Sequence, residues 1–320
     1  MIIAVAGGGA FGTALAVALT LDEKPITLWA RNAEAVKVMQ KTRQNLRLPN
    51  ITLPMQTKIT NKLPDLFAAE IILLATPAQT LRGFLNDHAD KLAGKSLIAC
   101  CKGIDLSTMT GPVDTIRRTV PSATAGILTG PSFADDVARG FPIALTLACA
   151  DQDKSLMLQT ALSTKTMRLY RTTDTTGAEL GSALKNVMAI VCGVCMGAGF
   201  GESARAALIT RGFEEMKRFA TRLGADPATL NGLSGFGDLA LTCTSEKSRN
   251  YRYGQAIGAG KKFDISTTVE GAATAQAVQR LAKSLDIDLP ICTVVADLTM
   301  DTTNVATALK SLLSRPLKEE

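Results

Sequence analysis

Residues 2–19, IIAVAGGGAFGTALAVAL, combine a short apolar run, a glycine-rich turn and a helical pattern. Gly7, Gly9 and Gly12 stand at the positions of a GxGxxG motif, after the first predicted strand and at the start of a predicted helix. Backbone N–H groups can approach a diphosphate at such a turn, because side chains are missing and the helix N-terminus attracts anions. The alternative is a turn that only packs helix on strand, but the position of the motif favours dinucleotide binding.

The rest of the first half repeats this alternation of strand and helix. Short apolar runs are typical of strands that are buried on both faces of a sheet. The predicted strands are Pro25–Ala30, Glu70–Thr76, Ser96–Cys100, Ala123–Thr129, Ile143–Ala148 and Met167–Tyr170. Strand signals nearly vanish after Thr173. We therefore predict an α/β protein with a Rossmann-type, mostly parallel sheet domain over residues 1–173 and an all-helical C-terminal domain over residues 174–320.

Composition excludes several classes of protein. The 320 residues carry a net charge of +6 without a long basic run, and only three Tyr and one Trp could stack on bases, so nucleic acid is not an expected partner. Seven cysteines indicate neither a disulfide framework nor a zinc site, and no other metal site is expected. Because the first residues lead directly into a strand, we expect no signal peptide and a soluble, cytoplasmic protein.

The end of the second predicted strand bears on the choice of coenzyme. A fold that selects NAD usually places an acid there, for the ribose 2′-hydroxyl. This chain instead has Arg31, which suits a 2′-phosphate, although Glu34 lies close enough in sequence to keep NAD open. Lys102 follows another predicted strand, and ligands in such folds lie at the carboxyl ends of the strands. We therefore predict NADP as the coenzyme, with NAD as the alternative.

The second half opens with a helix that is apolar on nearly every side. Between residues 178 and 200 only Glu179, Ser182, Lys185 and Asn186 are strongly polar. The uninterrupted apolar run 187–200 is shorter than the ~20 residues of a membrane span, so a buried core helix is predicted. The ammonium of Lys185 either snorkels to the edge of the core or faces a ligand.

A nicotinamide enzyme must move a proton as hydride moves, and histidine usually does so. The single histidine, His88, lies in a polar stretch without the features of a pocket, so we reject it as the catalyst. Lys185 is the better candidate, because burial and nearby cations ease the loss of its proton. Asp238, in a loop that contains three glycines, either orients Lys185 or caps a helix. Residues 248–250, Ser-Arg-Asn, either hold a phosphate or form a solvated basic loop.

Several segments together resemble the bacterial NAD(P)-dependent glycerol-3-phosphate dehydrogenases. They are Gly7–Leu15, Lys102–Gly103, Gly130–Ala134, Ala183–Val187, Ala207–Gly212, Gly235–Leu241 and Ser248–Asn250. The match runs nearly end to end and in the family's order. Two departures stand out: residues 45–49, NLRLP, lack the family's usual aromatic residue before Leu-Pro, and Ser203 replaces a common asparagine.

The resemblance implies interconversion of dihydroxyacetone phosphate and sn-glycerol 3-phosphate, which supplies the phospholipid backbone, with Lys185 as proton donor and acceptor. It assigns to the substrate Lys102, Gly130, Ser132, Lys185, Asp238, Ser248, Arg249 and Asn250. It assigns to the dinucleotide Ala10, Phe11, Arg31, Lys102, Ala134, Arg249 and Glu270, in addition to Gly7, Gly9 and Gly12 of the turn.

Two other functions share these features. A related β-hydroxyacid or ketopantoate-type reductase would also combine a Rossmann domain with a helical lysine domain, but a carboxylate substrate would not need residues 248–250. A dinucleotide sensor without catalysis is the second alternative. The sequence leaves open the NADPH/NADH preference, feedback regulation and the oligomeric state, a homodimer included.

Overall fold

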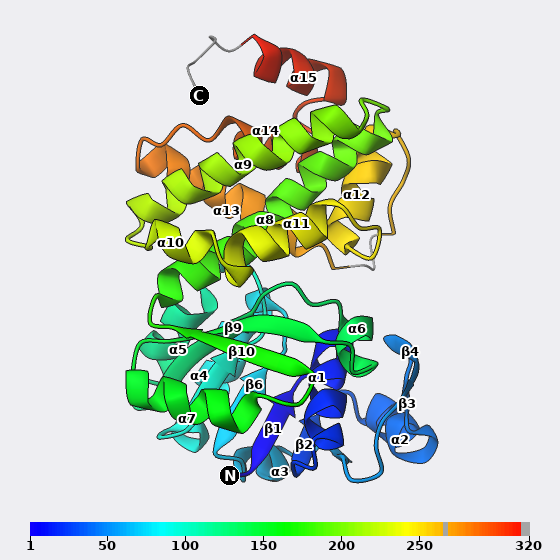
Figure 1. Cartoon of the computed structure of the whole chain (residues 1–320), viewed down its shortest axis with the longest axis vertical. Helices are drawn as coiled ribbons and strands as arrows, with labels where there is room; N and C mark the ends of the chain where they lie inside the picture. The colour runs from blue at the N-terminus through cyan, green and yellow to red at the C-terminus, as the bar shows by residue number, and fades with distance from the viewer. Residues whose placement is uncertain (265–267, 315–320) are drawn as a thin grey trace. The chain divides into compact units, whose positions relative to one another are not determined.

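A computed structural model describes residues 1–264 and 268–314. The chain divides into two compact units, each with its own core (Figure 1). The first unit comprises Met1–Lys102 and Thr110–Glu179, and the second comprises Gly103–Met109 and Leu180–Glu320.

The first unit is built on an eight-stranded sheet. Its strands, in spatial order, are β10 (Met167–Thr172), β9 (Ile143–Cys149), β8 (Thr124–Thr129), β7 (Ser96–Ala99), β6 (Ile71–Leu74), β1 (Ile3–Ala6), β2 (Ile26–Trp29) and β5 (Lys58–Thr60). Every neighbouring pair is parallel except β8 and β9. The predicted mostly parallel sheet is therefore confirmed, and the strand order reverses direction at β1, where a ligand crevice is expected.

Both faces of the sheet are covered by helices. Successive side chains of β1 point to opposite faces, so that Ile3 and Val5 enter one core while Ala4 and Ala6 enter the other. The first core is closed by α1 (Ala10–Leu21), α2 (Ala33–Thr42), α6 (Ala134–Ala138) and α7 (Gln152–Leu162). The second is closed by α3 (Leu63–Phe67), α4 (Ala78–Leu92) and α5 (Pro112–Thr119). This two-sided cover explains why the strands read as continuous apolar runs.

Three short strands were not predicted. They are β5, which extends the sheet beside β2, and a two-stranded hairpin of β3 (Gln44–Asn45) and β4 (Leu48–Thr52). Each has only two to five residues and several polar side chains. Such segments lack the apolar pattern that identifies a strand.

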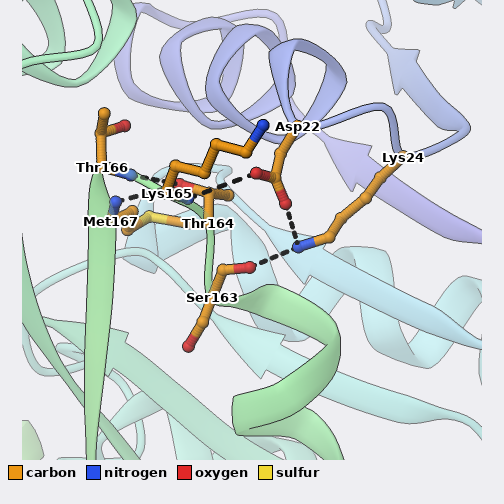
Figure 2. A network of polar contacts seen from close by, with 7 residues as sticks. All are labelled: Asp22, Lys24, Ser163, Thr164, Lys165, Thr166 and Met167. Atoms are coloured by element: carbon orange, nitrogen blue, oxygen red, sulfur yellow. Dashed lines mark hydrogen bonds and ion pairs between the residues drawn. The ribbon is translucent and has the colours of Figure 1, made fainter.

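A polar network ties together two turns of the first unit that are far apart in sequence (Figure 2). The Asp22 carboxylate lies 3.1 Å from the Lys24 ammonium and accepts a hydrogen bond of 3.2 Å from the backbone N–H of Lys165. Lys24 also donates to the carbonyl of Ser163. These contacts fasten the turn after α1 to the turn that precedes β10.

The second unit, within the described residues, consists of helices. They are α8 (Thr175–Gly197, which begins in the first unit), α9 (Glu202–Arg222), α10 (Pro227–Leu230), the π-helical turn η1 (Leu233–Gly237), α11 (Asp238–Cys243), α12 (Arg249–Gly258), α13 (Glu270–Ser284), α14 (Pro290–Thr299) and α15 (Val305–Leu313). Asp226 caps α10 and Pro227 opens it.

Helix α8 forms the centre of the second core. It is long and apolar enough to cross a membrane, but 89% of its apolar window is buried inside the structure. The predicted core helix is therefore confirmed. Glycines let α12 approach it closely: a Cβ at Gly193 would lie 2.0 Å from the Tyr251 carbonyl oxygen, and one at Gly254 would lie 2.0 Å from that of Ile190. The backbones thus touch, which fixes α12 against α8.

Candidate functional site

The glycine turn after β1 has the geometry that a diphosphate requires. Gly7 has φ +136°, and a Cβ there would lie 2.4 Å from the Ala75 carbonyl oxygen. A Cβ at Gly12 would lie 2.1 Å from the Gly7 carbonyl oxygen, so only glycine lets α1 pack on β1 here. Gly9, by contrast, has open space where its Cβ would be, and it caps α1 without a side-chain hydrogen bond. The open space lies at the N-terminus of α1, where a diphosphate fits.

The polar side chains that follow Arg31 are engaged at the start of α2. Asn32 uses its side chain to cap α2, accepting 2.9 Å from the N–H of Ala35. Glu34 forms an exposed ion pair with Lys37, with 2.8 Å between the carboxylate and the ammonium. Arg31 itself is exposed. Arg31 thus presents an exposed guanidinium just after β2.

The other predicted residues of the first unit follow strand ends. Lys102 is half-buried and comes three residues after β7. Gly130, at the end of β8, has φ +139°, and a Cβ there would lie 3.2 Å from the Cα of Leu145. The Ser132 hydroxyl donates to the carbonyl of Gly130 at 3.1 Å, and Ala134 opens α6. Since β1, β6, β7 and β8 run parallel, these positions share one edge of the sheet.

Lys185 and Asp238 form a buried ion pair in the second unit. The Lys185 ammonium lies 2.7 Å from Oδ1 of Asp238, and the two side chains are 9% and 1% exposed. The contact between them that the sequence suggested is thus present. Asp238 is the first residue of α11, directly after η1. A Cβ at Gly181 would lie 2.7 Å from the Ser234 carbonyl oxygen, so this glycine lets η1 reach α8, four residues before Lys185.

Residues 248–250 form the start of α12. The Ser248 side chain is buried and caps the helix, accepting 3.3 Å from the N–H of Tyr251. Arg249 is exposed at the first helical position. Asn250 Oδ1 accepts 3.0 Å from the N–H of Gly271, next to Glu270, which opens α13. The predicted phosphate residues therefore combine helix caps with one exposed guanidinium.

Sequence reasoning missed one residue that joins these groups. A Cβ at Gly271 would lie 2.6 Å from the Asn186 carbonyl oxygen and 2.8 Å from Oδ1 of Asn250. Gly271 thus connects the helix of Lys185 to the helix of Arg249. The one sequence signal was a glycine in the first turn of a helix, where it lowers helix propensity without an evident benefit.

A second buried carboxylate lies at the start of α8. Glu179 accepts a hydrogen bond from the backbone N–H of Val113, in the first turn of α5, and is 9% exposed. Burial raises the pKa of Glu179 to about 8, although the bond from Val113 opposes the shift. Gly111 leaves room for this carboxylate, because a Cβ there would lie 2.6 Å from Oε1 of Glu179.

The remaining candidates are structural. The His88 ring packs between Phe67 and Phe84, with ring centroids 5.3 and 5.1 Å away. The seven cysteines are free and buried. Burial raises the pKa of Cys243 well above its usual value. Across residues 1–264 and 268–314, no group of three or more His, Cys, Asp or Glu could hold a metal ion.

A Rossmann-type sheet with a glycine turn at its switch point, and a helical unit with a buried lysine, define a nicotinamide-dependent dehydrogenase. Family models for the N-terminus and the C-terminus of NAD-dependent glycerol-3-phosphate dehydrogenase match residues 2–155 and 174–310. The chain is 57% identical over 321 residues to a glycerol-3-phosphate dehydrogenase (NAD(P)+) of Roseobacter denitrificans, and the match covers both chains completely. The chain therefore belongs to the NAD(P)-dependent glycerol-3-phosphate dehydrogenase family.

Solved structures agree with this assignment. The crystal structure of glycerol-3-phosphate dehydrogenase from Coxiella burnetii is 31% identical, with a TM-score of 0.92 and coverage of 98% of this chain and 99% of that one. A ketopantoate reductase from Ralstonia eutropha is 15% identical with a TM-score of 0.65, over 98% of this chain and 100% of that one. The second likeness concerns the fold alone.

Proposed function

We propose that the chain reduces dihydroxyacetone phosphate to sn-glycerol 3-phosphate and that Lys185 donates the proton to the carbonyl oxygen. The observation that carries this proposal is the buried pair of Lys185 and Asp238, 2.7 Å apart. An ammonium has three N–H donors, and the bond to Asp238 uses one of them. Asp238 thereby orients the amine, which is what a general acid needs.

Bound NAD(P)H supplies the hydride when the carbonyl carbon is reduced. The protein's part is to stabilise the negative charge that develops on the carbonyl oxygen and to protonate that oxygen. The low exposure of both side chains supports this role, because an ammonium shielded from water interacts strongly with a developing charge. In the reverse direction the neutral amine accepts the proton of the alcohol.

We propose that the substrate phosphate binds at the start of α12. The exposed guanidinium of Arg249 and the N-terminus of this ten-residue helix both attract an anion. Gly271 and the close approach of α12 to α8 hold this end of the helix at a fixed distance from Lys185. Binding the phosphate there would give a three-carbon substrate most of its orientation.

The test compares substrates and variants by following NADPH absorbance. Wild type should reduce dihydroxyacetone phosphate and leave ketopantoate unchanged. Arg249→Gln should raise KM for dihydroxyacetone phosphate at least about 10-fold, the loss expected for a charge-assisted phosphate contact. Arg222→Gln, an exposed arginine at the end of α9, is the matched control and should leave KM unchanged. An unchanged KM in Arg249→Gln would contradict the phosphate assignment, and turnover of ketopantoate would contradict the substrate.

The physiological role follows from the product. We propose that the enzyme supplies glycerol 3-phosphate as the backbone of phospholipids. A strain that lacks the gene should need added glycerol 3-phosphate or glycerol for growth, and growth without either would contradict this role.

A further inference from the structure

The hairpin of β3 and β4 is anchored on the glycine turn. Asn45 is buried, and its Nδ2 donates 3.1 Å to the Gly8 carbonyl and 2.7 Å to the Thr13 hydroxyl. Gly8 belongs to the turn and Thr13 to the first turns of α1, so one amide joins the hairpin to the glycine turn and to the helix that follows it. Figure 1 shows β3 and β4 beside α2.

The same amide also holds the tip of the hairpin. Oδ1 of Asn45 accepts 3.0 Å from the backbone N–H of Arg47. Leu46 is 91% exposed, and Arg47 is exposed too. Arg43, just before the hairpin, differs: its guanidinium donates to the carbonyls of Leu53 and Thr57 at 3.2 and 3.0 Å. Arg43 thus has a structural role that Arg47 lacks.

The residue before Arg31 lies against the same turn. A Cβ at Gly8 would lie 2.7 Å from the Cβ of Ala30, the residue before Arg31. Gly8 therefore lies against Ala30, one residue before Arg31, and accepts a hydrogen bond from Asn45, two residues before Arg47. Among the residues that the structure describes, no hydrogen bond or ion pair engages the guanidinium of Arg31 or of Arg47. The closest acid in sequence to Arg31, Glu34, is already paired with Lys37.

We propose that Arg47 acts with Arg31 to bind the 2′-phosphate of NADP(H), so that Arg47 is a second determinant of coenzyme preference. This inference rests on the proposed coenzyme site at the glycine turn. A guanidinium binds phosphate oxygens through two parallel N–H bonds, and two such groups can share the charge of one dianion. NAD(H) has a hydroxyl at this position and gains nothing comparable.

The test is equilibrium binding without substrate, at low ionic strength, because exposed charges are screened by salt. Dissociation constants for NADP+, NAD+ and 2′,5′-ADP are measured by calorimetry for wild type, Arg47→Gln, Arg31→Gln and the double variant. Arg171→Gln is the matched control: it removes an exposed arginine from β10, at the opposite edge of the sheet from β2 and β5.

Arg47→Gln should raise Kd for NADP+ and 2′,5′-ADP about 10-fold, the loss of one charge-assisted contact, and should leave Kd for NAD+ within about twofold. The control should change none of the three. Equal weakening of NADP+ binding and NAD+ binding would overturn the proposal, because Arg47 would then contact a part of the dinucleotide that both coenzymes share. No change for NADP+ would overturn it as well. Because no ketone is present, failure of the proposed reduction would leave this result intact.

Discussion

The buried ion pair makes a sharp prediction about stability. Lys185 and Asp238 lie 2.7 Å apart with side chains 9% and 1% exposed, while Lys217 and Glu214 lie at the same distance with side chains 29% and 49% exposed. The two ion pairs therefore have the same distance between their charged atoms and differ in burial. Asp238→Ala should lower the free energy of unfolding by about 3–5 kcal/mol, because it leaves a buried charge uncompensated. Glu214→Ala should cost about 0.3–0.5 kcal/mol.

The assay must report on the second unit alone, since a chain of two units need not unfold in one step. Hydrogen exchange of α8 peptides, followed by mass spectrometry across a urea series, meets this need. Adding Lys185→Met to Asp238→Ala should recover part of the lost stability, because the unpaired charge is then gone. The reasoning is refuted if Asp238→Ala costs no more than Glu214→Ala, or if the double variant loses the sum of both single costs.

Two further predictions concern packing and pH. Gly254→Ala should destabilise the second unit by about 3 kcal/mol or more in urea unfolding, because its Cβ would meet the Ile190 carbonyl oxygen at 2.0 Å, whereas Gly83→Ala, in open space in α4, should be neutral or stabilising. Burial raises the pKa of Glu179 from 4.5 to about 8, so the folded state favours its protonated form. The free energy of unfolding should therefore fall as pH rises from 4.5 to 8, and Glu179→Gln should flatten this dependence; an identical slope in both proteins would argue against it.

The strands of the sheet and the core helix were predictable because each buries most of its side chains, which leaves a continuous apolar signal in the sequence. Ile71–Leu74, for example, is buried at every residue. The glycine turn was predictable for a different reason: local geometry requires glycine at Gly7 and Gly12, which leaves a fixed spacing in the sequence. These features depend on residues that are close in sequence.

Contacts between distant residues were not predictable. The amide of Asn45 bonds to Gly8, which lies 37 positions earlier, and Glu179 bonds to Val113, which lies 66 positions earlier. Neither has a periodic pattern, because a single polar side chain that caps a turn or a helix looks like any loop residue in sequence. The hairpin and its arginine therefore emerged only from the fold.

The central claim is that Lys185 transfers the proton, and the rate of NADPH oxidation with dihydroxyacetone phosphate in Lys185→Met tests it most directly. The rate should fall at least about 100-fold, the usual contribution of a general acid, while Kd for NADPH stays at the wild-type value. Lys217→Met, which removes the half-buried lysine paired with Glu214 in the same unit, should keep the wild-type rate. A Lys185→Met enzyme that folds, binds NADPH and turns over within about threefold of wild type would contradict the account.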